Sequence, residues 1–202
     1  MKVEKIRLEG KFVRLETLQI GHLEQLCEVG LEESLWLWTA NIIKTSADMK
    51  RYIETALDEF RRGVSLPFVT IEKSSEKIVG STRFGNIDAK NRKAEIGWTW
   101  INPRWQRTFV NTEAKLLMLT HAFETWKCIR VELKTDVLNE KSQNAMLRIG
   151  AQKEGILRRH LITDAGRFRD SVYFSIIDSE WQTVKANLEA KLRNNGSNKF
   201  QN

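Results

Sequence analysis

The chain has 202 residues, 41% of them hydrophobic, and a formal net charge of +7 at pH 7. A chain of this length can bury about 70% of the surface that it exposes when unfolded, so a sizeable core is available. No run of about 20 apolar residues occurs and the N-terminus lacks the apolar stretch of a signal peptide, so we expect no membrane span and a cytoplasmic location.

Charge and residue counts restrict the partners only in part. A positive net charge attracts nucleic acids, acidic proteins and phosphorylated cofactors alike, and no long Lys/Arg block chooses among them. The two cysteines, Cys27 and Cys128, are too few and too far apart for a disulfide framework or a zinc site. The three histidines are scattered without ligand spacing, so we expect no metal.

The N-terminal half is predicted to contain one strand, two helices and three further strands. Apolar residues recur at helical spacing in the second helix, from Met49 through Ile53 to Phe60. A turn-rich segment at residues 86–93 separates the last two strands, which favours an antiparallel meander. The expected ranges are a strand at 11–15, helices at 20–29 and 46–62, and strands at 66–72, 77–85 and 94–101.

The C-terminal half begins with a broadly apolar helix that is expected to pack on a sheet. The expected ranges are helices at 112–126, 139–150 and 179–192, a strand at 128–136, and hairpin strands at 152–162 and 167–177. From residue 193 the sequence turns polar and is expected to fray. No linker interrupts residues 1–192, so we expect a single domain there.

This order of elements predicts a mixed α/β or α+β fold with helices on both faces of the sheet. The strand at 94–101, the helix after it and the strand at 128–136 form a strand–helix–strand unit. Such a unit makes a parallel strand pair, here at the centre of an otherwise antiparallel sheet.

Three stretches, taken in order and with their spacing, resemble the GNAT superfamily of N-acetyltransferases. They are "AEIGWTW" at 94–100, "NTEAKLLMLTHAFE" at 111–124 and "DVLNEKSQNAMLRIGAQKEGILR" at 136–158. The similarity covers residues 8–192 and is closest to the RimJ/RimL-type branch, which acetylates the N-termini of ribosomal proteins. The resemblance implies a GNAT fold whose central parallel strands splay apart to hold acetyl-CoA.

The segment before the apolar helix departs from the family pattern. By resemblance a loop of the form Q/R-x-x-G-x-G/A binds the pyrophosphate, but Phe109 and Asn111 occupy its two small positions. Backbone N–H groups and the helix dipole bind phosphate without glycine, so we expect a working site with altered geometry, with Asn111 or Thr112 as the N-cap. A plain strand-to-helix turn and a degenerate loop remain alternatives. The implied cofactor-binding residues here are Gln106, Arg107, Thr108, Phe109, Val110, Asn111 and Thr112.

The resemblance also implies contacts along the rest of the cofactor. The backbone of Trp100 and Ile101 is expected to pair with the pantetheine arm. Asn139 and Ser142 match the family's N-x-x-S signature, in which the asparagine contacts the pantetheine and the serine protonates the departing thiolate. The alternative is structural, because Asn139 is also an apt N-cap and Ser142 falls in the first turn of the same helix.

Glu95 is the candidate general base. Strict alternation places Glu95, Gly97 and Thr99 on one face of their strand, so Glu95 points toward a cleft or solvent. The family's glutamate at this position takes a proton from the attacking amine through ordered water. The alternatives are an exposed glutamate paired with Lys or Arg, and Glu132 as a weaker rival base.

The implied function is direct acetyl transfer from acetyl-CoA to a primary amine, either a protein N-terminus or a small molecule. The acceptor is expected between the helices of residues 20–62 and the closing hairpin. Nucleic acid is expected only through a ribosomal substrate, and the protein is expected to be a monomer or homodimer. The alternative is a catalytically weak GNAT module that binds acyl-CoA or an anionic partner such as RNA.

Overall fold

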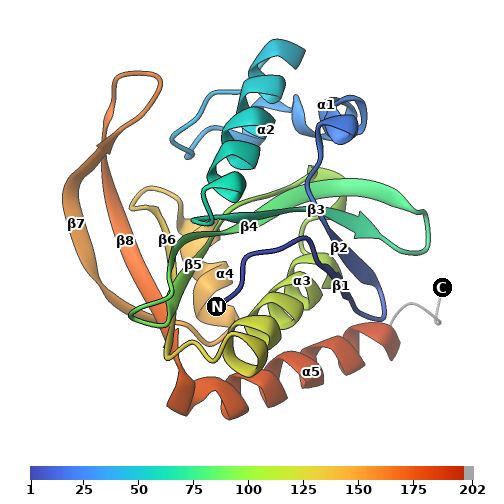
Figure 1. The fold of residues 1–202 in the computed structure, drawn as a ribbon, viewed down its shortest axis with the longest axis vertical. Coiled ribbons are helices and arrows are strands. Elements are labelled where there is room, and N and C mark those ends of the chain that lie inside the picture. Colours follow the sequence, from blue (N-terminus) through green and yellow to red (C-terminus); the bar gives the residue numbers. More distant parts are fainter. Residues whose placement is uncertain (198–202) are drawn as a thin grey trace.

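The computed structural model describes the backbone of residues 1–197, which forms one eight-stranded sheet between two layers of helices (Figure 1). The strand order is β1-β2-β3-β4-β5-β6-β8-β7, and only β5 and β6 pair in parallel. The predicted mixed sheet with one central parallel pair is therefore confirmed. The strands are β1 Arg7–Glu9, β2 Val13–Thr17, β3 Leu66–Glu72, β4 Lys77–Asp88, β5 Lys93–Ile101, β6 Arg130–Asp136, β7 Gln152–Ile162 and β8 Phe168–Ile177.

The helices cover both faces of the sheet, as expected. Helices α3 and α5 lie on one face and α1 and α2 on the other (Figure 1). A π-helical turn, His121–Thr125, continues α3 toward β6. The helices are α1 Leu23–Gly30, α2 Ser46–Arg61, α3 Phe109–Thr120, α4 Glu140–Arg148 and α5 Trp181–Ser197.

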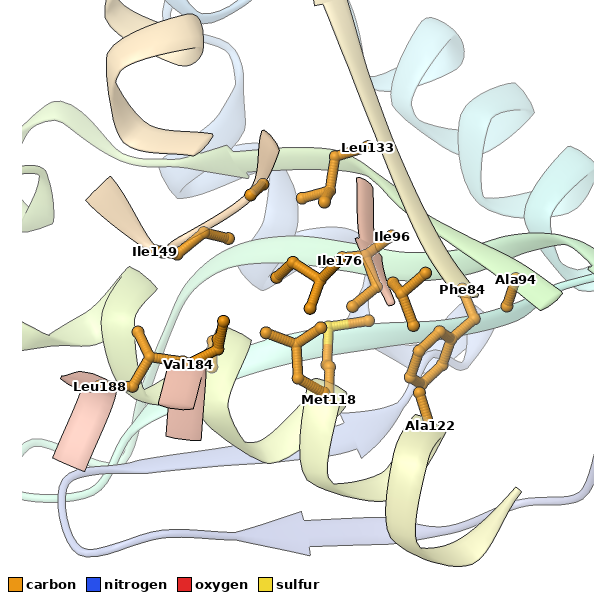
Figure 2. Close-up of a cluster of buried hydrophobic side chains, with 14 of the residues drawn as sticks. Phe84, Ala94, Ile96, Met118, Ala122, Leu133, Ile149, Ile176, Val184 and Leu188 are labelled. Carbon is orange, nitrogen blue, oxygen red and sulfur yellow. The ribbon is translucent and has the colours of Figure 1, made fainter. Parts of the chain in front are cut away.

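Two apolar clusters fill the spaces between the layers. On the α3 and α5 face, strand residues such as Ile96 and Ile176 meet Met118 of α3 and Val184 of α5 (Figure 2). On the α1 and α2 face, Leu26, Trp36, Met49 and Ile53 pack against the sheet together with Trp100. Because β5 contributes to both clusters, its position between the two helical layers is fixed by packing from both sides.

The N-terminal strand differs from the expectation. Instead of one strand at 11–15, β1 and β2 form a hairpin in which Leu8 pairs with Leu15. A three-residue strand is too short to show alternation in the sequence, which is why it was missed. At the other end, α5 continues to Ser197, so the helix ends later than expected. Extending a packed helix by a turn costs little. Residues 198–202 of the expected polar tail lie outside the described residues.

Candidate active site

The parallel strands β5 and β6 separate after a short paired region. Their pairing ends at Glu95 and Glu132, although β5 runs on to Ile101 and β6 to Asp136. We call the opening between residues 96–101 and 133–136 the wedge. An unpaired strand edge offers backbone donors and acceptors to an extended ligand, which can add as a further strand. Trp100 and Ile101 lie on this edge, on the strand that also pairs with β4.

Two helices begin at the open end of the wedge. Because β5 and β6 are parallel, their carboxyl ends lie at the same edge of the sheet. The chain after β5 leads into α3, and the chain after β6 leads into α4. The N-terminus of a helix carries partial positive charge and directs backbone N–H groups outward, which suits an anionic group such as a phosphate.

The residue that needs left-handed backbone in the loop before α3 is Arg107, not Phe109. Arg107 is exposed and has φ +60°, whereas Phe109 is the first helical residue and has no positive φ. The Phe109 ring is buried, with its centroid 4.6 Å from that of Phe12. Its side chain thus belongs to the core, and glycine at this position is not required by backbone conformation.

The expected N-cap of α3 is wrong. Thr108 is the N-cap, and its hydroxyl accepts a hydrogen bond from the Val110 N–H at 3.3 Å. The left-handed turn at Arg107 and the extended Thr108 start the helix directly, so Asn111 and Thr112 lie inside the first turn. Val110 and Thr112 are both buried.

Gln106 has a partner within the protein. Its side-chain amide donates to the Ile101 carbonyl at 2.9 Å, which braces the loop against the end of β5. Asn139 likewise has a structural role, since it caps α4 by accepting from the Ser142 N–H at 3.0 Å. Asn139 and Ser142 therefore lie together at the helix start that follows β6. The binding and acid roles expected of them stay predictions.

A β-bulge in β5 overturns the expected alternation. Trp98 has φ +49°, and the register with β4 shifts between Ser81 and Arg83. After the bulge, Thr99 faces α3, where Lys115 donates to its hydroxyl at 2.8 Å. Trp100 faces the other way and packs 5.6 Å from Trp36. Glu95, Trp98 and Trp100 thus share the α1 and α2 face. The extra residue of the bulge exchanges the faces on which the residues after it would lie in a regular strand.

Glu95 is buried rather than directed to solvent, with only 3% of its surface exposed. Its carboxylate accepts hydrogen bonds from Asn86 Nδ2 and Lys134 Nζ, each at 2.8 Å. The Lys134 ammonium also lies over the rings of Trp98 and Tyr173, at 5.9 and 5.7 Å. Of the alternative reading, a solvent-exposed glutamate paired with Lys or Arg, the lysine partner is present but the exposure is wrong, because these donors and rings enclose the carboxylate. The rival Glu132 pairs with Arg130 at 2.9 Å.

The two segments expected to border the acceptor meet above this face. The Asp164 N–H in the β7–β8 turn donates to the Ala40 carbonyl, and the Ile42 N–H donates to the Asp164 carboxylate, both at 2.9 Å. Arg167 lies 5.8 Å over the Trp38 ring and pairs with Asp136, the last residue of β6. We call this connection between the α1–α2 loop and the hairpin the arch.

His160 of β7 also faces this side of the sheet. Its Nδ1 lies 3.0 Å from the Ser171 hydroxyl, and its ring is 5.5 Å from that of Tyr173. Burial, followed by the positive charges of Lys134 and Arg169, lowers the pKa of His160. The lowered pKa favours the neutral imidazole as the form that bonds to Ser171.

The sequence interpretation missed Lys115 and Lys134. Lys115 is three and four residues before Met118 and Leu119, so helical periodicity places it on the buried face of α3. Lys134 is two residues after Glu132 on the same side of β6. Both signals were present in the sequence, but a lysine is ordinarily read as a surface residue.

In the described part of the chain, no group of three or more His, Cys, Asp or Glu side chains is arranged to hold a metal ion. No helix within residues 1–197 is long and apolar enough to cross a bilayer.

Comparison with known proteins identifies the family. The pattern of the family described as acetyltransferase (GNAT) domain matches residues 13–152. The ribosomal N-acetyltransferase YdaF of Bacillus subtilis (strain 168) is 32% identical over 183 residues, which cover 87% of this chain and 97% of YdaF. The ribosomal-protein-serine acetyltransferase of Escherichia coli (strain K12) is 22% identical over 172 residues, covering 83% of this chain and 94% of that protein.

Solved structures agree. The crystal structure of a GCN5-related N-acetyltransferase from Brucella melitensis has a TM-score of 0.85 and 31% sequence identity, covering 93% of this chain and 85% of that one. The family match spans β2 through the start of β7, and therefore includes the wedge and the starts of both helices at its open end. The chain belongs to the GNAT family of N-acetyltransferases.

Proposed function

We propose that this N-acetyltransferase takes its acetyl group from acetyl-CoA bound in the wedge and transfers it directly to a primary amine. The observation that carries the proposal is the separation of β5 and β6 after Glu95, with two helix N-termini at the open end. The unpaired edge suits the amide-containing pantetheine arm, and the helix starts suit the pyrophosphate. The acetyl thioester supplies an activated acyl group.

The residues proposed to bind acetyl-CoA lie along the wedge. The backbone of Trp100 and Ile101 would hold the extended arm, and residues 106–112 would hold the pyrophosphate through the N-terminus of α3. Asn139 and Ser142 would contact the arm from the α4 side. The burial of Phe109 supports a working loop. Its ring packs on Phe12 and therefore does not cover the N-terminus of α3.

The chemistry needs a neutral amine and a route for its proton. An α-amino group has a pKa near ~8, so a sizeable fraction is neutral at physiological pH. We assign Glu95 as the base, receiving the proton through water on the α1 and α2 face, and Ser142 as the acid for the departing thiolate. The Asn86 and Lys134 contacts would fix the Glu95 carboxylate in position.

Direct transfer is favoured over an acetylated cysteine. Cys128 is buried, and desolvation raises the pKa of its thiol to about 11, so it is not a nucleophilic thiolate near neutral pH. Cys27 lies on α1, which is neither a strand nor a loop bounding the wedge. No carrier step is therefore assigned to either thiol.

The acceptor is proposed to be a protein N-terminus that enters below the arch. The support is the naming of two relatives as ribosomal acetyltransferases, and a cytoplasmic location is part of the same proposal. A small-molecule amine is the alternative acceptor.

RNA binding without turnover is the second candidate function, favoured by the net charge of +7. Strongly salt-dependent RNA binding with no transfer to any amine would select it.

The base assignment is tested by Glu95→Gln. We expect turnover with an accepted amine to fall about 100-fold at neutral pH, the usual size of a general-base effect, while the Kd for acetyl-CoA changes less than twofold. Glu132→Gln tests the rival base in the same assay, because Glu132 is the neighbouring strand glutamate and also has a cationic partner, and we expect it to keep turnover within about threefold of wild type. An unchanged pH–rate profile in Glu95→Gln removes Glu95 from the mechanism.

The role of Asn139 is tested by comparing alanine with serine. Asn139→Ala removes both the cap and the side-chain amide, whereas Asn139→Ser retains a good N-cap. If Asn139 contacts the cofactor, both variants weaken acetyl-CoA binding in calorimetry. If serine restores wild-type affinity, the cap alone explains the residue.

A further inference from the structure

Lys115 is a buried lysine that the proposed mechanism does not use. It lies on α3 against β4 and β5 and is only 5% exposed. Its Nζ donates to Thr99 Oγ1 at 2.8 Å and lies 3.4 Å from Thr82 Oγ1. Among the side chains that the structure describes, no carboxylate forms an ion pair with it. Its polar partners are two neutral hydroxyl groups.

This environment favours the neutral amine. Desolvation lowers the pKa of Lys115 to about 7, so at pH 8 most of the side chain is uncharged. A neutral, desolvated lysine amine is a competent nucleophile toward carbonyl carbon.

Thr99 connects this amine to the wedge. Although it belongs to a central strand, Thr99 is exposed, since β6 no longer covers β5 beyond Glu95. It directly precedes Trp100 and Ile101, the residues proposed to hold the pantetheine arm. One hydroxyl group therefore separates Lys115 Nζ from the opening. For Nζ to react in the wedge, the flexible four-carbon side chain has to carry it past that hydroxyl.

We propose that Lys115 is an internal acetyl acceptor, a modification site at which the protein acetylates itself from acetyl-CoA held in the wedge. The inference rests on the proposed function. The Nζ–C bond of an amide forms, the C–S bond of the thioester breaks, and the proton that leaves the amine goes to the sulfur to give free coenzyme A. The acetylated side chain can no longer carry a charge, and its added volume lies at Thr99, beside the proposed cofactor path.

The test follows acetylation in the full-length protein without an amine acceptor. The protein is incubated with acetyl-CoA at pH 8, and each lysine is followed by peptide mass spectrometry over time. Lys50 is the reference for non-specific chemical acetylation, because its side chain is 56% exposed on α2. We expect Lys115 to be acetylated at least tenfold faster than Lys50, and excess desulfo-CoA to slow Lys115 without affecting Lys50.

A parallel calorimetric titration separates this inference from the proposed function. If acetyl-CoA binds but Lys115 reacts no faster than Lys50, the internal acceptor is refuted and the cofactor site stands. If acetyl-CoA does not bind, both the internal acceptor and the proposed function are refuted. Thr99→Val gives a second measure that keeps Lys115 in place. It removes the hydroxyl that holds Nζ, and we expect the rate at Lys115 to change at least threefold while that of Lys50 stays constant; equal rates at Lys115 in the two proteins count against the inference.

Discussion

Backbone conformation at Arg107 and Phe109 determines how the loop before α3 can meet an anion. Arg107 is in the left-handed region at φ +60°, while Phe109 is helical and buried against Phe12. The sequence shows which residues replace the family's small ones, but it does not show which position carries positive φ. The residue at which glycine has a conformational advantage is therefore two places earlier than the pattern suggests.

Exchanging these two residues for glycine separates packing from conformation. Phe109→Gly removes a buried ring and should lower the free energy of unfolding by about 3–5 kcal/mol. Arg107→Gly should stay within about 1 kcal/mol of wild type, since relief of left-handed strain offsets the greater freedom of the unfolded chain. Urea unfolding measures the free energy of unfolding of both variants.

The same variants test the loop as a cofactor site. Phe109→Gly is expected to bring no gain in acetyl-CoA affinity, because the ring points into the core. A large gain would show that Phe109 impairs the site.

Lys115 should give the protein a characteristic pH dependence of stability. Its folded pKa of about 7 lies below the ordinary lysine value near ~10.4, so between these values the unfolded chain binds more protons than the folded one. The free energy of unfolding then rises with pH across this window by up to about 1.4 kcal/mol per unit.

Lys115→Met removes this contribution while keeping an unbranched apolar side chain. From pH 7 to pH 9 the free energy of unfolding of the wild type should therefore increase relative to that of Lys115→Met. Urea unfolding at several pH values tests it, and parallel stability curves would show that Lys115 keeps an ordinary pKa.

At the scale of elements, one carboxylate connects the N-terminal hairpin to helix α3. Glu113 of α3 is buried and accepts the backbone N–H groups of Lys11, Phe12 and Val13 in the turn between β1 and β2. A Cβ at Gly10 would come within 2.5 Å of this carboxylate, so the turn also needs glycine there. The hairpin thus depends on a residue about a hundred positions away.

Glu113→Ala should lower the free energy of unfolding by about 3 kcal/mol or more, because it leaves buried N–H groups without their charged acceptor. Glu113→Gln should fall between this variant and wild type, since its amide oxygen can still accept. The control is Glu24→Ala, an exposed glutamate on α1, with an expected effect below about 0.5 kcal/mol. Equal stability of the two alanine variants would contradict the role of Glu113.

The elements that the sequence predicted well are those whose pattern is local. β3 at 66–72 and α2 at 46–61 match the expected ranges to within a residue, because Pro67 marks the start of the strand and helical spacing marks the helix. The start of α3 and the faces of β5 were wrong, because a left-handed Arg107 and a bulge at Trp98 leave no periodic signal. Side-chain partners such as Lys134 for Glu95 depend on sheet register, which alternation alone does not supply.

At the scale of the whole molecule, the sheet divides the protein into two sides, one covered by α3 and α5 and the other by α1 and α2, and β5 and β6 separate at its centre. The parallel pair was predictable from the strand–helix–strand order, and its splaying was expected through the family resemblance. The arch was not predictable in detail, since its contacts join Ala40 and Ile42 to Asp164 over a long sequence separation. Asp136 connects the two sides, as it ends β6 at the wedge and pairs with Arg167 beneath the arch.

The central claim is that the wedge binds acetyl-CoA, and calorimetric titration of the purified protein with acetyl-CoA tests it most directly. Desulfo-CoA serves as the control for thiol-dependent artefacts. We predict that each ligand binds at one site with micromolar affinity. The unpaired edge of β5 would recognise the pantetheine arm and the helix N-termini the pyrophosphate, and neither feature depends on the thioester. Absence of heat at several temperatures, together with no thermal-shift response, would contradict the account and direct attention to the basic surface instead.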